Sequence, residues 1–149
     1  MSSTTTTMNQ FSTFRVADQL FGVDVGRVQE VIRYQPMTPV PMARPAVAGL
    51  INLRGQVVTA VDLRVQLGLP PRAEGELPLN VVVRTGEEAV SLLVDSIGDV
   101  VDTTGDLFEA PPETVSGPAR ELISGAYKLE GKLLLALDVD RAVDVDRTS

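Results

Sequence analysis

The last third of the chain repeats part of its first half, and this repeat limits the folds that the sequence can adopt. Residues 47–62 and 123–138 align at a fixed offset of 76. A weaker similarity relates residues 25–32 to residues 94–101 at an offset of 69. A solenoid needs roughly three or more repeats to bury a continuous core, so two units predict two similar β modules. Identical pairs at the first offset are Gly49 and Gly125, Leu53 and Leu129, Gly55 and Gly131, Ala60 and Ala136, and Asp62 and Asp138.

The apolar segments have the length and composition of strands. They are short, rich in β-branched residues and bounded by glycine, proline or charged residues. Residues 50–61 are predicted to form a hairpin, and residues 122–137 its counterpart. Gly55 and Gly131 are assigned structural roles in the two turns because glycine adopts positive φ readily, and Gly125 is assigned a structural role within its repeat. About five short strands per unit favour a small barrel over an open sheet.

Two aspartates at one repeat position are predicted to begin short helices. Asp62 precedes a short apolar segment that stops at Gly68, and Asp138 opens the terminal segment 138–145. An aspartate at this position can accept a hydrogen bond from a free N–H of the first helical turn, and glycine commonly ends a helix. Because Asp62 and Asp138 occupy the same repeat position, we expect each to play the same structural role. A pair of catalytic carboxylates is the less favoured interpretation.

The length of 149 residues is that of one domain, and the two units suggest how it is divided. Residues 1–10 are rich in Ser and Thr and are predicted to form a disordered tail. Residues 11–149 are predicted to form a single domain of two barrels. The first barrel is expected to span about residues 14–78, and the second about residues 11–13 plus 79–145.

The composition argues against several functional classes. The net charge of −7 disfavours nucleic acid and anionic lipid, because both require clustered Lys and Arg. The chain has no Cys and no His, so it lacks the thiolate nucleophile, the commonest general base and the commonest transition-metal ligand. The acidic residues within 138–146 lack the glycine and the terminal glutamate of an EF-hand loop. No catalytic residue, metal, cofactor or membrane insertion is therefore assigned, and a cytoplasmic location is expected.

The positions at which the two repeats carry different charges are the candidates for function. Arg54 occupies the first hairpin turn, whereas Glu130 occupies the second. Glu30 lies in the same unit as Arg54, and Asp99 stands at its repeat-equivalent position. We hypothesise that Glu30 and Arg54 approach each other at the rim of a groove between the barrels. The alternative is that Arg54 is an ordinary solvated turn residue.

The residues around Glu30 leave two interpretations open. Val28 and Val31 are three residues apart with charges between them, which predicts a single helical turn over residues 27–30. Val28, Val31 and Ile32 are either ordinary barrel core or an exposed apolar strip on which a partner docks.

Four segments together resemble the CheW family of chemotaxis coupling proteins over about residues 11–145. This resemblance implies an all-β fold of two intertwined five-stranded SH3-like β-barrels with short helical turns and a short C-terminal helix. It implies a non-enzymatic adaptor between the cytoplasmic tip of methyl-accepting chemoreceptors and the regulatory domain of a CheA-type histidine kinase, recruited to receptor arrays at the membrane. The segments are Val28-Gln29-Glu30-Val31, Gly49-Leu50-Ile51-Asn52-Leu53-Arg54-Gly55, Val61-Asp62-Leu63 and Val94-Asp95-Ser96-Ile97.

The resemblance also assigns roles to individual residues. Glu30 and Arg54 match an acid–base pair associated with receptor coupling, and Val28 and Gly49 match positions whose disturbance affects receptor binding. Val31 is assigned to the same receptor-binding set. The family often has proline where this chain has Ala60, a departure that leaves the pairing of this strand open.

Two alternative functions are kept. The first is an adaptor of a non-flagellar chemosensory system, such as one controlling pilus motility. The second is a small-molecule-binding β-barrel module that uses the groove between the barrels as its pocket.

Overall fold

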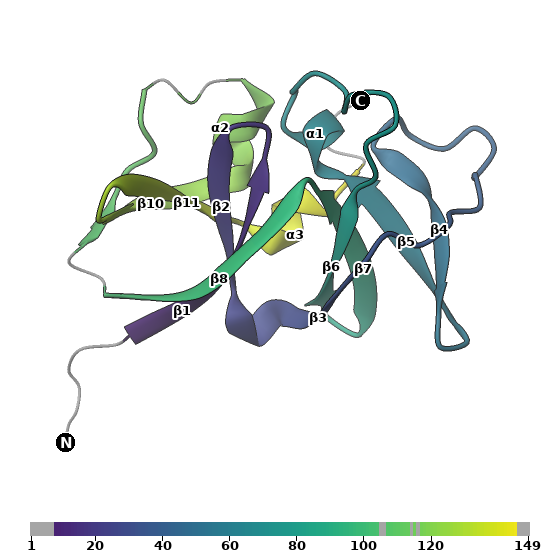
Figure 1. The fold of residues 1–149 in the computed structure, drawn as a ribbon, viewed down its shortest axis with the longest axis horizontal. Helices are drawn as coiled ribbons and strands as arrows, with labels where there is room; N and C mark the ends of the chain where they lie inside the picture. Colours follow the sequence, from purple (N-terminus) through teal and green to yellow (C-terminus); the bar gives the residue numbers. More distant parts are fainter. Residues whose placement is uncertain (1–7, 105–106, 114, 116, 146–149) are drawn as a thin grey trace.

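The computed structural model describes residues 8–104, 107–113, 115 and 117–145, which form two β-sheets (Figure 1). The five-stranded sheet has the order β3-β6-β7-β5-β4, and the six-stranded sheet has the order β8-β1-β2-β11-β10-β9. The strands are β1 (Met8–Val16), β2 (Gln19–Asp24), β3 (Val28–Ile32), β4 (Val47–Leu53), β5 (Gln56–Asp62), β6 (Leu79–Thr85), β7 (Glu88–Val94), β8 (Ser96–Thr104), β9 (Phe108–Glu109), β10 (Ile123–Leu129) and β11 (Lys132–Leu137). The helices are the 3-10 helix η1 (Val25–Arg27), α1 (Leu63–Gln66), α2 (Pro118–Leu122) and α3 (Val139–Ala142).

Each half of the chain contributes strands to both sheets. Strands β1 and β2 pair in the six-stranded sheet, and the chain then crosses through η1 into the five-stranded sheet to form β3, β4 and β5. Strands β6 and β7 stay in the five-stranded sheet, and the chain returns at Asp95 to form β8 to β11. The parallel pairs β5–β7 and β2–β11 join the two halves. The predicted all-β class of two intertwined barrels is confirmed, with the short β9 added at one edge.

The repeat in the sequence is a repeat in strand register. In the two parallel pairs, Ala60 lies opposite Ser91 and Ala136 lies opposite Gly22. The offsets of 76 and 69 convert the first pair into the second. The hairpins β4–β5 and β10–β11 also share a register shift at the same repeat position. The two hairpins lie in different sheets, as the repeat predicts.

The predicted limits of the two barrels need correction. Strands β6 and β7, placed in a second barrel of residues 11–13 plus 79–145, lie in the five-stranded sheet with β3, β4 and β5. Strands β1 and β2, placed mostly in a first barrel of residues 14–78, lie in the six-stranded sheet. Hydrophobic periodicity reports local structure and gives no information on which distant strands pair. Of the predicted tail, residues 8–10 belong to β1, and residues 1–7 lie outside the described part of the chain.

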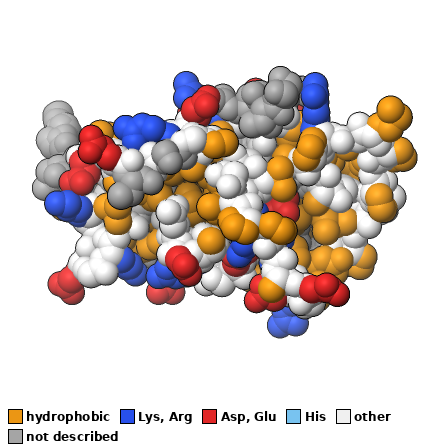
Figure 2. Space-filling model, turned by 90° about the horizontal axis from the view of Figure 1, so that it is seen from above, with side chains coloured by type: hydrophobic (Ala, Val, Ile, Leu, Met, Phe, Trp, Pro, Cys, Tyr) orange, Lys and Arg blue, Asp and Glu red, His pale blue; other side chains and the backbone are white. Residues whose placement is uncertain are grey.

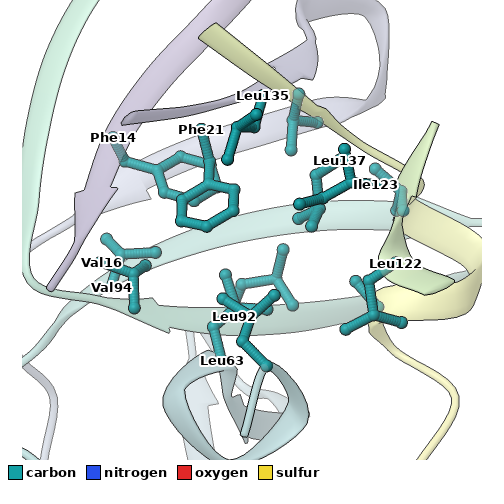
Figure 3. Close-up of a cluster of buried hydrophobic side chains, with 14 of the residues drawn as sticks. Phe14, Val16, Phe21, Leu63, Leu92, Val94, Leu122, Ile123, Leu135 and Leu137 are labelled. Atoms are coloured by element: carbon teal, nitrogen blue, oxygen red, sulfur yellow. The ribbon is translucent and has the colours of Figure 1, made fainter. Parts of the chain in front are cut away.

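The largest hydrophobic core lies between the two sheets. Phe14 and Phe21 from the six-stranded sheet face Leu92 and Val94 from the five-stranded sheet (Figure 3). Helices α1, α2 and α3 cover this core and add buried residues to it, among them Leu63. Each barrel also has a smaller apolar cluster of its own. The centre of the space between the sheets is therefore filled by buried side chains. A surface pocket lined by Ala17 of the β1–β2 turn, Arg64 of α1, Arg72 and Asp95 lies outside this core.

Asp62 and Asp138 begin the two equivalent short helices. The Asp62 carboxylate accepts a hydrogen bond from the Arg64 backbone N–H at 3.0 Å, and Asp138 accepts one from the Arg141 backbone N–H at 3.2 Å. Gly68 follows α1 with a φ of +73°. These contacts satisfy N–H groups that have no partner within the helix.

Gly125 allows strand β9 to pass close to β10. A Cβ atom at Gly125 would lie 2.1 Å from Phe108 Cζ and 3.0 Å from the Glu109 carbonyl oxygen. The Phe108 ring also contacts the Tyr127 ring, with 5.1 Å between their centroids. The absence of a side chain at Gly125 thus leaves the room that β9 occupies beside β10.

We predict that Gly125→Ala destabilises the protein by about 1–3 kcal/mol, because the added methyl group overlaps the Phe108 ring and the strand must shift. Chemical denaturation measures this change. Gly131→Asn is the control, because a Cβ atom at Gly131 would meet no neighbouring atom within 4 Å and asparagine tolerates the positive φ of this position. Equal stability of Gly125→Ala and the wild type would contradict the close packing of β9 on β10.

Candidate functional site

Glu30 and Arg54 form a two-pronged ion pair in the five-stranded barrel. Arg54 Nη1 donates a hydrogen bond to Glu30 Oε1 at 3.0 Å, and Arg54 Nη2 donates a second to Glu30 Oε2. Glu30 lies on β3, and Arg54 lies in the turn between β4 and β5. Because β3 and β4 are the opposite edges of this sheet, the pair joins the two edges and closes the barrel. We call this pair the Glu30–Arg54 fork.

The fork therefore lies within one barrel and not, as the sequence suggested, at the rim of a groove between two barrels. The Glu30 side chain is 20% exposed, whereas the Arg54 side chain is 69% exposed. The hydrogen bonds from Arg54 lower the pKa of Glu30 below its usual value and outweigh burial, which acts in the opposite direction. Glu30 in turn raises the pKa of Arg54. Both groups thus stay charged at neutral pH, with the guanidinium on the outside.

The helical turn predicted over residues 27–30 is wrong, because β3 begins at Val28. Val28 lies opposite Val83 and Glu30 opposite Val82, so Gln29 is the extra residue of a β-bulge. The extra residue interrupts the alternation of inward and outward side chains along β3. Val28 and Val31 are therefore three residues apart, which is the spacing expected of one helical turn. A short 3-10 helix is present, but it ends at Arg27.

The bulge also decides which residues of β3 face outward. Val28 packs at the margin of the core between the sheets, and Ile32 packs against the apolar cluster inside the five-stranded barrel. Val31 is 39% exposed. Of the two interpretations of the apolar residues around Glu30, core packing describes Val28 and Ile32, and an exposed apolar side chain describes Val31.

The turn that carries Arg54 has an unusual backbone. Arg54 has a φ of +52° and Gly55 a φ of +85°, and the Gly55 N–H donates to Asn52 Oδ1 at 2.9 Å. Two consecutive positive φ values are typical of the tight two-residue hairpin turn, and a non-glycine residue with positive φ is uncommon. In the equivalent turn Gly131 has a φ of +74°, whereas Glu130 does not have a positive φ. The turn and the fork together direct the Arg54 guanidinium toward β3.

Gly49 is buried and serves the packing of a neighbouring segment. A Cβ atom at Gly49 would lie 2.8 Å from the Thr38 carbonyl oxygen. Thr38 and Leu50 exchange two backbone hydrogen bonds of 2.8 Å beside it. In the other barrel Gly125 has the same relation to β9. The structure thus places Gly49 where it supports the β4 edge, away from the exposed surface.

Hydrophobic side chains are visible over both barrels, and several of them lie at the end of the molecule formed by the five-stranded barrel (Figure 2). Exposed large hydrophobic residues from this part of the chain are Val31, Val40, Met42, Val57 and Val65.

A network around Asp95 was not found from the sequence. Its carboxylate accepts hydrogen bonds from Arg64 Nη2 at 2.6 Å, the Ala17 backbone N–H at 2.7 Å and Arg72 Nε at 3.0 Å. Burial raises the pKa of Asp95, but the hydrogen bonds from Arg64, Ala17 and Arg72 outweigh it and the pKa is lowered overall. Asp95 lies where the chain crosses between the sheets, so the network fastens this crossing to α1 and to the linker before β6. The Val-Asp motif was visible in the sequence, but its distant partners were not.

Metal binding and membrane crossing have no support among the described residues. These residues contain no group of three or more His, Cys, Asp or Glu side chains that could hold a metal ion. No helix among them is both long enough and apolar enough to cross a membrane.

The chain belongs to the CheW-like domain family, whose profile matches residues 10–147. The "Chemotaxis protein CheW" of Rhizobium meliloti (strain 1021) is 32% identical over 127 residues, which are 85% of this chain and 82% of that protein. The protein of the same name from Thermotoga maritima is 31% identical over 131 residues, which are 88% of this chain and 85% of that protein. The crystal structure of the scaffolding protein TtCheW from Thermoanaerobacter tengcongensis has the same fold, with a TM-score of 0.79, 24% identity and coverage of 88% of this chain and 89% of that one.

We predict that Asp95→Asn lowers the free energy of unfolding at pH 7 by about 1–2 kcal/mol, after allowance for solvent screening of this partly exposed network. The pKa of Asp95 is lowered in the folded protein, so its contribution is complete above the ordinary carboxyl pKa and is lost as the pH falls through the folded value. The difference between the variant and the wild type should therefore shrink below about pH 4. Denaturation at several pH values tests this, with Asp99→Asn as the exposed control; a difference that persists at low pH would contradict the ionic network.

Proposed function

We propose that this chain is a non-enzymatic adaptor that couples chemoreceptors to a CheA-type histidine kinase. Membership of the CheW-like domain family over nearly the whole chain is the observation that carries this proposal. The names of its relatives, chemotaxis proteins and a scaffolding protein, support it. The adaptor would be cytoplasmic and recruited to receptor arrays at the membrane.

Receptor docking is assigned to β3 and the adjacent hairpin turn. A guanidinium has five N–H donors in a plane, and the fork uses two of them on Glu30. The other donors of the exposed Arg54 are available to a carboxylate or carbonyl oxygen on the receptor tip. Val31 would supply an apolar contact beside them, and Val28 would support Val31 from the core margin.

Gly49 would affect receptor binding indirectly. Because it is buried against Thr38, a larger residue there would displace the segment that lies beside β4 and disturb the edge to which Arg54 belongs. In this interpretation Gly49 does not contact the receptor. A substitution at Gly49 would weaken receptor binding because it displaces the neighbouring segment.

The regulatory domain of the kinase would bind a different part of the surface from the receptor. Interfaces between signalling proteins of this type are often small, with a total buried area below about 1,200 Å². High local concentration in a receptor array would compensate for weak individual contacts. The same geometry serves an adaptor in flagellar chemotaxis or in another chemosensory system, and the identity of the captured receptors decides between them.

The fork provides the sharpest test of receptor docking. Arg54→Ala should leave the melting temperature nearly unchanged, because the Arg54 side of the pair is exposed to solvent and such ion pairs contribute little to stability. It should weaken binding to a soluble receptor fragment by about tenfold or more, because the charge of Glu30 is left unpaired at the interface. A titration of each variant by calorimetry measures this effect.

Two further variants complete the test. Glu130→Ala is the matched control, because Glu130 occupies the equivalent turn of the other barrel and should leave receptor affinity unchanged. Adding Glu30→Ala to Arg54→Ala should cost less than the sum of the single changes, because the two residues act as a unit. Wild-type affinity in Arg54→Ala would refute receptor docking at the fork, and a large fall in its melting temperature would assign the fork to stability.

The adaptor role itself predicts a dependence on both partners. In a reconstituted mixture, receptor should change the rate of kinase autophosphorylation only when this protein is present. The protein alone should neither hydrolyse ATP nor become phosphorylated, because it has no phosphate-binding loop and no histidine. Labelling of the isolated protein by radioactive ATP, or receptor control of the kinase without it, would contradict the proposal.

A further inference from the structure

The chain crosses between the sheets twice, and at each crossing an ion pair connects it to a short helix. In one pair the crossing residue is the base, and in the other it is the acid. At the second crossing, Asp95 pairs with Arg64 of α1 at 2.6 Å. At the first crossing, Arg27 of η1 pairs with Asp140 of α3, also at 2.6 Å. Arg64 and Asp140 are equivalent at the offset of 76, and Arg27 is one residue beyond the equivalent of Asp95. Both repeats thus have an ion pair between the crossing and the helix, but the positions of the acid and the base are exchanged.

The two fastenings differ in burial. The side chains of Arg64 and Asp95 are 14% and 20% exposed, and Asp95 has further donors from Arg72 and Ala17. Those of Arg27 and Asp140 are 37% and 67% exposed. The pair at the first crossing, which we call the Arg27–Asp140 clasp, is therefore the weaker of the two.

The clasp lies directly before β3. Arg27 Nε also donates to the Arg84 carbonyl oxygen at 3.0 Å, so the Arg27 side chain is held at two points. Strand β3 is short, contains a bulge and has β6 as its one neighbour in the sheet. Its start is thus fixed by the ladder with β6 and by Arg27, whereas the Glu30–Arg54 fork fixes its middle.

We propose that Arg27 and Asp140 are positioning residues for β3, and that they hold its bulge and Glu30 in the conformation that docks the receptor. The effect on receptor binding rests on the proposed function, whereas the effect on the conformation of β3 does not. Without the clasp, β3 would fluctuate at its start, and binding would have to order it again. Because the clasp connects the first half of the chain to the last helix, it also makes the docking strand depend on α3.

An exposed ion pair without a positioning role has little effect on any property of the protein. A clasp that positions β3 has a local effect on the strand and a small effect on the whole fold. Local and global stability must therefore be measured separately.

The experiment uses the full chain with Arg27→Glu, Asp140→Arg and the double charge exchange. Hydrogen exchange followed by mass spectrometry or NMR reports on the β3 amides, and a thermal melt reports on the whole fold. Each single variant should raise exchange of the β3 amides by about fivefold or more while changing the melting temperature by less than about 4 °C. Exchange of the β3 amides should be slower in the double variant than in Arg27→Glu, because the ion pair is rebuilt with opposite polarity, although the hydrogen bond from Arg27 to the Arg84 carbonyl oxygen is not.

Arg33→Glu is the matched control. It makes the same change in charge just after β3, and the Arg33 side chain has no ion-pair partner within the described part of the chain. It should leave exchange in β3 unchanged. Unaltered exchange in the single variants, or exchange in the double variant as fast as in Arg27→Glu, would overturn the positioning role.

Receptor titrations separate this inference from the proposed function. Affinity for the soluble receptor fragment should fall by about threefold or more in each single variant and recover at least in part in the double variant. Altered exchange with unaltered receptor affinity would overturn the docking consequence. Failure of the wild-type chain to bind receptor would instead overturn the proposed function, and the exchange measurements would still decide whether the clasp positions β3.

Discussion

The parallel pairs β5–β7 and β2–β11 are the contacts on which the rest of the structure depends. Each joins a strand from one half of the chain to a strand from the other half, so both halves are needed for either barrel. The same pairing surrounds one shared core with residues of both sheets, such as Phe21 of β2 and Leu92 of β7. The barrels are therefore one structural unit, and a surface on one has a defined position relative to a surface on the other. A scaffold that connects two partners requires this property.

The two repeats share their packing but differ in their charges, and the proposed receptor site lies at this difference. The strand pairing and the glycine packing are duplicated, with Gly49 and Gly125 in the same role. The charges are not duplicated. The five-stranded barrel closes with the Glu30–Arg54 fork, whereas the equivalent positions of the other barrel both carry acids. One barrel thus presents an exposed guanidinium at its hairpin turn, whereas the equivalent turn of the other barrel presents the acid Glu130.

Features encoded by nearby residues could be predicted from the sequence. The turn glycines, the capping aspartates and the hairpins depend on contacts within a few residues, and the repeat showed that they occur twice. The approach of Glu30 to Arg54 was predicted because their charges break the repeat. Its position at the closure of one barrel was not, because it depends on the curvature of a whole sheet.

Other features depend on contacts that have no local signature. The exchange of strands between halves changed the limits of both barrels, and the bulge at Gln29 made β3 resemble a helical turn. The network of Asp95 with Arg64 and Arg72 connects the second crossing between the sheets to helix α1 and to the linker before β6. Nothing in the spacing of these residues along the chain indicates that they meet.

Receptor docking on the five-stranded barrel, at β3 and the Arg54 turn, is the proposal on which the mechanism depends. Titration of the isotopically labelled chain with a soluble receptor-tip fragment, followed by NMR, tests it most directly. Docking at this site predicts that the largest chemical-shift changes fall on residues 28–32 and 54–55, with little change at the repeat-equivalent residues 97–101 and 130–131. Changes concentrated on the equivalent residues of the six-stranded barrel, or spread equally over both sets, would contradict it.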